Sequence, residues 1–236
     1  MPTLQDIDVL ILCGGLGKRL RSVESKNPKV MAAVAGRPFL DTIIEALKAQ
    51  GVKRIIFLTG YKSDIIEHYY TKNNFGLSFV FSREKEPLGT GGAVKLSKGL
   101  IQSDPFIVLN GDSFCDVDLG AFIKFHVFKK AQVSLVAAYA NEKKDFGAIS
   151  LNREKRVVKF AEKKESSGKY LNAGVYCFNR NIFKDMPLLK RFSLEYDFFP
   201  SLLGKNFFGY EVKKKFWDIG TPERFKDAQK IFGVKK

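Results

Sequence analysis

The chain has 236 residues, 45% of them hydrophobic, and its 40 Lys and Arg against 25 Asp and Glu give a net charge of +15. Apolar residues recur along the whole sequence, which excludes a disordered chain and provides for a packed core. Three widely spaced cysteines without metal-type spacing argue against a secreted disulfide framework. The first apolar run, Val9–Cys13, is too short for a signal-peptide core or a membrane span, so we expect a cytoplasmic protein.

The basic charge raises the question of nucleic-acid binding, because Lys and Arg neutralise phosphates. The charges are spread along the chain, however, with only modest clusters at 153–169 and 213–215. A solvated basic surface is therefore favoured over a nucleic-acid interface. Small phosphate-bearing substrates would be attracted by the same field.

Strand-like and helix-like segments alternate in the first half of the chain. Short apolar runs predict buried strands at 7–12, 54–58, 77–81 and 106–109. Helical spacing predicts helices between Pro38 and Gly51, at 63–70 and at 90–100. This alternation is typical of a mostly parallel sheet with helices on both faces.

The second half changes character. Short strands are predicted at 133–138, 147–151, 156–160 and 173–178, as an antiparallel excursion before a final helix at 222–231. The overall class is three-layer α/β. In open sheets of this class, ligands bind outside the carboxyl ends of the strands.

Glycines follow the first predicted strand in the segment Gly14-Gly15-Leu16-Gly17-Lys18-Arg19. Glycine lets the backbone approach a ligand with its N–H groups turned towards phosphate oxygens, and Arg19 adds a planar cation suited to phosphate. The segment is neither a dinucleotide fingerprint, since Leu20 replaces the third glycine, nor a Walker loop. We interpret it as a phosphate-binding loop in preference to an ordinary turn.

A second glycine-rich turn, at 86–93, follows another predicted strand. It could admit a flat base or a phosphate, with Glu86 accepting hydrogen bonds from base N–H groups. The alternative is a flexible connector that precedes the next helix.

Two aspartates complete the candidate site. Asp112 ends the fourth strand in Asn110-Gly111-Asp112, where it either holds Mg²⁺ or belongs to a simple turn. Near the C-terminus, Thr221 and Pro222 are typical of a helix start, which leaves Asp218 without a structural role.

Taken in order, these segments resemble the nucleotidyltransferase family that makes nucleotide sugars, from about Asp8 to about Ile231. Lys18 stands where the family has Thr, and Val30 where a second Pro is common. The chain is most similar to D-glycero-α-D-manno-heptose 1-phosphate guanylyltransferases, while mannose-1-phosphate guanylyltransferases and glucose-1-phosphate thymidylyltransferases share most of the frame. The segments that carry the resemblance are 14–20, Pro28-Lys29, 87–93, 110–112, Glu162-Lys163, 172–176 and 217–222.

The resemblance implies a three-layer, Rossmann-like α/β fold with a mostly parallel mixed sheet and a small antiparallel sugar-binding excursion. It implies a single catalytic domain over residues 1–236, without the C-terminal β-helix of several relatives. The implied catalytic residues are Arg19, Lys29, Asp112, Lys163 and Asp218, with Mg²⁺ held by Asp112 and Asp218. The nucleotide would be bound by Leu12, Gly14, Gly15, Gly17, Arg19, Lys29, Glu86, Gly89, Thr90 and Asp112, and the sugar by Gly147, Glu162, Lys163, Asn172 and Gly174.

The expected reaction is in-line attack by a sugar 1-phosphate on the α-phosphorus of a nucleoside triphosphate, with GTP implied by the resemblance. Positioning and charge neutralisation dominate such a reaction, because two anions must meet. Arg19 would steady the β- and γ-phosphates, Lys29 would contact phosphate near the reacting centre, and Lys163 would bind the sugar phosphate. No catalytic histidine arrangement is evident, so His68 and His126 are expected on helix surfaces.

Two other functions stay open. A basic α/β module that binds RNA or nucleotide without chemistry would account for the charge, but the sequence has no aromatic-rich recognition motif. A catalytically silent regulatory homologue would not need the intact set of candidate catalytic residues. We expect no nucleic-acid and no membrane partner, and the choice between a monomer and a homo-oligomer is left open.

Overall fold

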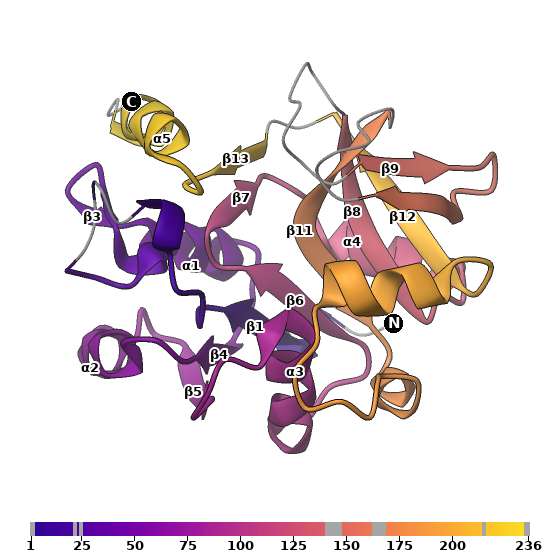
Figure 1. Cartoon of the computed structure of the whole chain (residues 1–236), viewed down its shortest axis with the longest axis horizontal. Helices are drawn as coiled ribbons and strands as arrows, with labels where there is room; N and C mark the ends of the chain where they lie inside the picture. The colour runs from indigo at the N-terminus through magenta and orange to yellow at the C-terminus, as the bar shows by residue number, and fades with distance from the viewer. Residues whose placement is uncertain are drawn as a thin grey trace.

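The computed structural model describes residues 3–20, 23, 26–139, 148–161, 169–213 and 216–233. Within these ranges the centre of the molecule is a nine-stranded mixed sheet (Figure 1). Its strands are β1 (Asp8–Leu12), β4 (Arg54–Thr59), β5 (Ser78–Arg83), β6 (Phe106–Asn110), β8 (Val133–Tyr139), β9 (Ala148–Leu151), β10 (Val157–Ala161), β11 (Tyr170–Phe178) and β12 (Phe207–Val212). The main path runs β10-β9-β11-β6-β1-β4-β5, with β8 between β11 and β12.

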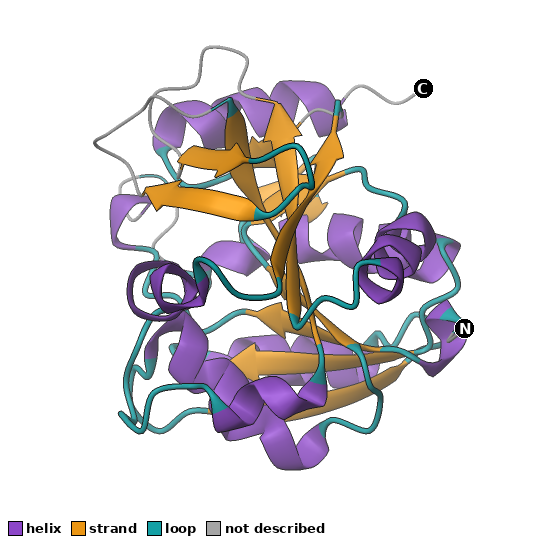
Figure 2. Ribbon diagram, turned by 90° about the vertical axis from the view of Figure 1, so that its right-hand side faces the viewer, coloured by secondary structure: helices purple, strands orange, loops and turns teal. Residues whose placement is uncertain are grey.

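The half of the sheet built by β6, β1, β4 and β5 is parallel throughout. Side chains of β1 alternate between its two faces, with Val9 and Ile11 in one core and Leu10 in the other. The first core is covered by α1 (Phe39–Ala49), α2 (Ser63–Lys72), α4 (Leu119–Phe128) and α5 (Pro222–Gly233). The second is covered by α3 (Gly89–Leu96) and the segment 180–202, so that helices lie on both sides of the strands (Figure 2).

The other half is built around β11, a strand that changes neighbour along its length. Residues 175–178 pair antiparallel with β6, whereas Tyr170 and Leu171 pair with β9. The register of β11 against β8 shifts between Asn172 and Tyr176, and Gly174 within the shift has a φ of +68°. The antiparallel excursion is therefore present, and it is followed by a strand that was not predicted, β12, which joins β8 in parallel after a long crossover.

One helix was not predicted. The segment of α4 is apolar almost all round, so it lacks the polar stripe by which a surface helix is identified. Its start is nevertheless encoded locally, because the Asp118 carboxylate accepts a hydrogen bond from Ala121 N at 2.8 Å. In the described part of the chain, no helix combines the length and the apolar character that a membrane crossing requires.

The expectation for His126 was wrong. Its ring lies inside the molecule at 1% exposure, with Nδ1 2.9 Å from Ser134 Oγ and Nε2 3.1 Å from Asn179 Oδ1. Burial lowers its pKa, since the charged imidazolium loses hydration, although Asn179 and Asp104 oppose the shift. His68 lies exposed on α2, as expected.

Two small antiparallel pairs complete the fold. The strand β7 (Ser113–Cys115) pairs with β13 (Phe216–Asp218), and β2 (Ala33–Val34) pairs with β3 (Arg37–Pro38). The helix α5 joins them, because the Gln229 side chain donates to Ala33 O at 2.6 Å and accepts from Ala35 N at 3.0 Å. The C-terminal segment is thereby fixed beside the carboxyl end of β6 (Figure 1).

Candidate active site

A cavity of about 290 Å³ opens at the carboxyl ends of β1 and β6. Three loops that are far apart in sequence surround it, namely those that follow β1, β5 and β6. Several of the predicted nucleotide-binding residues line this cavity, and others that line it were not predicted. The lining residues are Leu12, Gly14, Gly15, Leu16, Lys29, Val30, Glu84, Pro87, Gly89, Thr90, Ala93, Asn110, Asp112 and Arg191.

The glycine loop and Lys29 support one another. Gly17 has a φ of +59°, and a Cβ added there would lie 3.1 Å from Lys29 Cβ, so a larger residue would press on the lysine. Lys29 begins a short 3-10 turn, Lys29–Met31, whose other two residues are buried. Its ammonium forms an ion pair with Asp112 Oδ2 in the cavity, and its side chain is 11% exposed.

The Asp112 carboxyl is held ionised. Burial acts to raise its pKa, but it is outweighed by the charge and hydrogen bond of Lys29, a backbone N–H and, last, the charge of Arg19, so the pKa stays below its ordinary value. Arg19 itself is exposed and does not line the cavity. It therefore acts on Asp112 through its charge and is accessible to solvent.

The structure brings Asp112 and Asp218 together through the β7–β13 pair. Asp218 stands opposite Ser113, and Ile219 N donates to Asp112 O at 3.0 Å. A Cβ added at Gly220 would lie 2.6 Å from Asp218 Oδ1 and 3.6 Å from Lys29 Nζ. The lysine thus lies close to both carboxylates, which no spacing rule in the sequence could have shown.

The donor set at this point fits Mg²⁺. Asp218 Oδ1 accepts from Gly220 N at 2.7 Å, and Arg224 lies 3.3 Å from both Asp218 oxygens as an ion pair. Asp218 Oδ2 is buried and accepts no hydrogen bond from the described residues. Asn110 Oδ1, at the end of β6, is also buried and has no hydrogen-bond partner among the described residues. The described residues contain no cluster of three or more His, Cys, Asp or Glu. A set of two carboxylates, to be completed by phosphate oxygens and water, suits Mg²⁺ better than a cation that needs a full protein cage.

Of the two neighbouring glutamates, Glu84 lines the cavity and Glu86 does not. Glu84 directly follows β5, and its Oε2 accepts from Leu88 N at 3.1 Å. Its side chain fits between two glycines, since a Cβ added at Gly14 or Gly60 would lie 2.8 or 2.5 Å from its Oε1. Burial raises the pKa of Glu84, with the Leu88 N–H opposing. Glu86 is exposed, does not line the cavity and forms an ion pair with Lys190.

On the expected sugar side, Asn172 and Gly174 lie in the irregular part of β11. Asn172 donates to Tyr176 OH at 2.8 Å and accepts from Gly174 N at 3.1 Å, so both ends of its amide are oriented. A Cβ added at Gly174 would lie 2.6 Å from Asn110 Nδ2, which places this strand against the lining of the nucleotide cavity. The other predicted sugar-side residues, Gly147, Glu162 and Lys163, lie outside the described residues.

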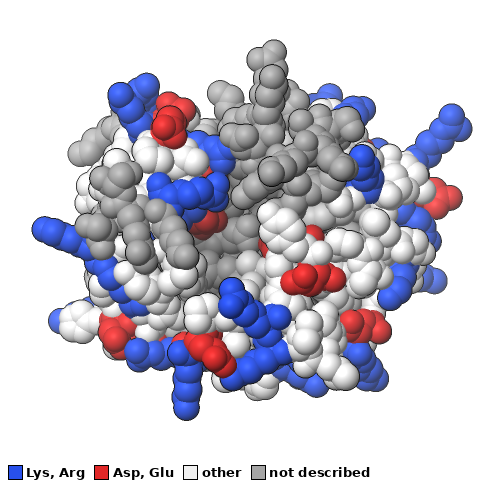
Figure 3. Space-filling model, viewed as in Figure 1, with Lys and Arg blue, Asp and Glu red and all other residues white. Residues whose placement is uncertain are grey.

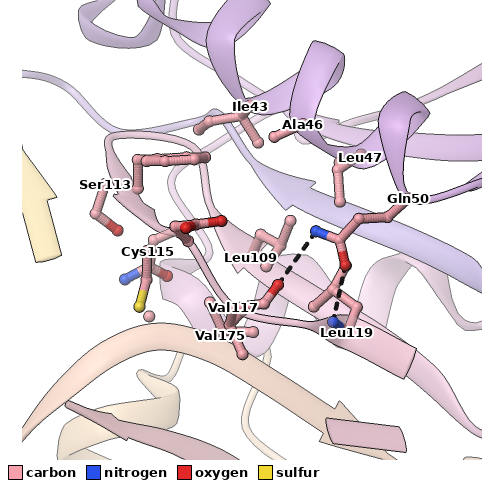
Figure 4. Close-up of a pocket in the computed structure, with 14 residues that line it drawn as sticks. Ile43, Ala46, Leu47, Gln50, Leu109, Ser113, Cys115, Val117, Leu119 and Val175 are labelled. Atoms are coloured by element: carbon pink, nitrogen blue, oxygen red, sulfur yellow. Dashed lines mark hydrogen bonds between the residues drawn. The ribbon is translucent and has the colours of Figure 1, made fainter. Parts of the chain in front are cut away.

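Asn110 and Gly174 also line a second, much smaller pocket of about 30 Å³. Figure 4 shows this pocket. Gln50 encloses it, because its side chain donates to Val117 O at 3.1 Å and accepts from Leu119 N at 2.9 Å. This volume has room for about one water molecule and none for a sugar. Of these two, the cavity at the carboxyl ends of β1 and β6 is therefore the candidate substrate site.

A comparison with known proteins assigns the class. The nucleotidyl transferase family matches residues 8–233, and the chain belongs to this family. A D-glycero-alpha-D-manno-heptose 1-phosphate guanylyltransferase from Aneurinibacillus thermoaerophilus is 40% identical over 95% of this chain and 97% of its own length. A mannose-1-phosphate guanylyltransferase from Mycobacterium tuberculosis is 35% identical over 93% of this chain, which spans 62% of that relative.

The fold is shared as well. The crystal structure of HddC from Yersinia pseudotuberculosis complexed with GMP-PN superposes with a TM-score of 0.86 at 36% identity, over 96% of this chain and 99% of the other. The expected α/β fold with a mixed, mostly parallel sheet is thereby confirmed, and the chain is a nucleotidyltransferase.

Proposed function

We propose that this protein transfers the GMP group of GTP to D-glycero-α-D-manno-heptose 1-phosphate, with Mg²⁺, and releases pyrophosphate. The observation that carries the proposal is the meeting of the glycine loop, Lys29 and the two aspartates at one end of the sheet. Such a set of backbone N–H groups, cations and carboxylates suits a triphosphate. The sugar and the base are taken from the guanylyltransferases that match almost the full chain.

Glu84 supports guanine as the base. Guanine presents an N1–H and an amino group side by side on one edge, and a carboxylate accepts two such donors. A half-buried carboxylate on the cavity wall is costly to leave unpaired, which favours a base that can donate to it. Thymine and uracil offer one N–H on that edge, between two carbonyl groups.

In the proposed reaction, a phosphate oxygen of the sugar 1-phosphate forms a bond to the α-phosphorus of GTP, and the bond from that phosphorus to the β-phosphate oxygen breaks. The negative charge leaves with pyrophosphate. Lys29 would hold the α-phosphate next to Asp112, and Arg19 with Arg191 would face the leaving phosphates from the rim. Asp112 and Asp218 would hold Mg²⁺, which supplies charge neutralisation at the reacting phosphate.

The charge distribution gives little support to a polynucleotide-binding function. Lys and Arg side chains are scattered over the face shown in Figure 3, with acidic side chains among them. Nucleic-acid binding favours basic residues gathered on one face or along one helix. The candidate cavity instead has the size of a small-ligand site.

The test is pyrophosphate release by the purified protein with Mg²⁺, crossing GTP, CTP, UTP, ATP and dTTP with heptose 1-phosphate, mannose 1-phosphate and glucose 1-phosphate. Release confined to GTP with the heptose supports the full proposal. Release with GTP and mannose 1-phosphate would retain the base and replace the sugar. If the folded protein released no pyrophosphate with any pair of nucleotide and sugar phosphate, the proposed activity would be overturned.

A further inference from the structure

A buried carboxylate outside the cavity connects its two sides. Glu195 is 8% exposed and lies in a π-helical turn, Leu194–Phe198, beside α3 (Figure 1). Its Oε2 accepts from Thr90 Oγ1 at 2.6 Å and from Ser193 Oγ at 2.8 Å, and its Oε1 accepts from Tyr176 OH at 3.1 Å. Thr90 lines the nucleotide cavity, whereas Tyr176 belongs to β11.

On the sugar side, each group in the chain of hydrogen bonds donates to the next one. Asn172 donates to Tyr176 OH at 2.8 Å, and the same hydroxyl donates to Glu195. A hydroxyl at this place could exchange roles with the tyrosine hydroxyl, but a carboxylate oxygen only accepts. Glu195 therefore fixes the hydroxyl as donor, the hydroxyl fixes the Asn172 amide, and the remaining N–H of that amide is left for a ligand.

On the nucleotide side the connection is made by the backbone as well. Phe192 N donates to Leu88 O at 3.0 Å, and Phe192 O accepts from Gly91 N at 3.0 Å and from Gly92 N at 3.2 Å. Thr90 Oγ1 also accepts from Leu194 N at 2.8 Å. The segment 192–195 and the glycine turn at 87–92 are therefore joined by several hydrogen bonds, and the Glu195 carboxylate connects them to Tyr176.

Stability alone does not explain why a glutamate occupies position 195. In the described part of the chain no Lys or Arg pairs with Glu195, and hydroxyl groups are its only side-chain partners. Burying a carboxylate among neutral donors is costly, and an apolar residue of the same volume would serve a purely structural position at least as well.

We propose that Glu195 is a positioning residue that sets the sugar-contacting strand in register with the nucleotide-binding turn, through Tyr176 and Asn172. This inference rests on the proposed function, since it assigns the two ligands to the two sides. Both substrates must be held in line for attack, and small misplacements cost much of the rate.

The kinetic test uses Tyr176→Phe and Glu195→Leu, each of which removes the hydrogen bond between Tyr176 and Glu195. We expect kcat to fall about 10-fold and the KM for sugar phosphate to rise about 5-fold in both variants. The KM for GTP should stay within about twofold, because the Phe192 backbone still holds the glycine turn. Glu195→Gln, which keeps an acceptor for Tyr176, should restore most of the activity. The double variant should be no slower than either single one.

Tyr170→Phe is the matched control. It removes a hydroxyl from the same strand, where Tyr170 OH donates to Glu211 Oε1 at 2.5 Å, and should leave all three constants unchanged. Equal changes in both KM values, losses that multiply in the double variant, or no rescue by Glu195→Gln would each overturn the proposal.

A second measurement separates this inference from the proposed activity. Hydrogen exchange of the protein without substrates should be faster at 171–176 in Glu195→Leu than in the parent, and unchanged at 88–93. Unchanged exchange at 171–176 would overturn the positioning role whatever the substrate. A parent protein without turnover, but with this exchange pattern, would overturn the proposed activity and leave the connection standing.

Discussion

Lys29 and Asp112 form an ion pair across 83 residues of sequence, at the wall of the cavity that we assign to the nucleotide. The lysine side chain is 11% exposed and the carboxylate 38%. The pair keeps the Asp112 carboxyl ionised at the end of β6. The ammonium is then already in place when an anionic substrate enters.

The first prediction concerns the two aspartates. Asp112→Asn and Asp218→Asn should each lower kcat at least about 100-fold, since each removes a charged group from the reacting centre. The measurement is pyrophosphate release with Mg²⁺, beside a thermal melt to show that the variants fold. Asp116→Asn, an exposed carboxyl close in sequence to Asp112, should retain full activity. Normal turnover in both site variants would sink the metal assignment.

The second prediction tests Glu84 against Glu86. The enzyme should prefer GTP over ITP, which lacks the amino group, by about 10-fold or more in kcat/KM, because the site would leave a carboxylate partly unpaired. Glu84→Gln should reduce that preference to less than about threefold. Glu86→Gln, whose parent side chain lies outside the cavity, should keep it. An unaltered preference in Glu84→Gln would assign base recognition to other groups.

The third prediction concerns a buried ion pair that joins β1 to β4. The Asp8 side chain, 4% exposed, accepts from Arg54, from Ser103 N at 3.0 Å and from Gln102 N. Asp8→Ala leaves these donors unpaired and should lower the free energy of unfolding by about 3 kcal/mol.

Urea denaturation at constant pH measures this loss. The control is Asp64→Ala, which breaks an exposed pair with Arg83 and should cost less than about 0.5 kcal/mol. A loss of under about 1 kcal/mol in Asp8→Ala would show that the buried pair contributes little.

The fourth prediction concerns pH. Because burial lowers the pKa of His126 below its ordinary value of 6.5, the unfolded chain binds a proton at pH values where the folded chain does not. The stability that depends on neutral His126 is complete above pH 6.5 and is lost as the pH falls towards the folded pKa. The free energy of unfolding should therefore fall on acidification, by at most about 1.4 kcal/mol per pH unit.

His126→Asn should reduce this slope below pH 6.5 in a series of urea denaturations, although it lowers stability overall. His68→Asn changes an exposed histidine on α2 and should leave the slope unchanged. Parallel curves for the parent and His126→Asn would contradict the assignment of this slope to His126.

The sequence predicted best where local rules determine the outcome. Buried runs such as that of β1, and glycines after strands, identify the parallel half of the sheet and the edge where ligands bind. The pairing of Asp218 with Ser113 depends on a strand pair of three residues, which has no local signal of its own. The strand pair itself was not predicted, and the meeting of Asp112 and Asp218 was expected from the family resemblance alone.

Glu84 was missed for a different reason. It directly follows β5, at the carboxyl end of a strand, where ligands bind in such sheets. Glu86, two residues later, was predicted instead because it begins the glycine-rich turn. Arg191 lies in an irregular segment without periodicity, and only the folded chain brings it to the cavity. The role of Glu195 has no local signal in the sequence, because its partners Thr90 and Tyr176 are distant along the chain.

All three cysteines, Cys13, Cys115 and Cys177, are buried. Burial raises the pKa of the Cys13 and Cys177 thiols, and alkylating reagents attack thiolates. A single cysteine introduced at Leu188, which is 99% exposed, would therefore accept a fluorophore or spin label without removal of the native thiols. In the unlabelled protein, the rate at which the buried native thiols are alkylated would report how often the core opens.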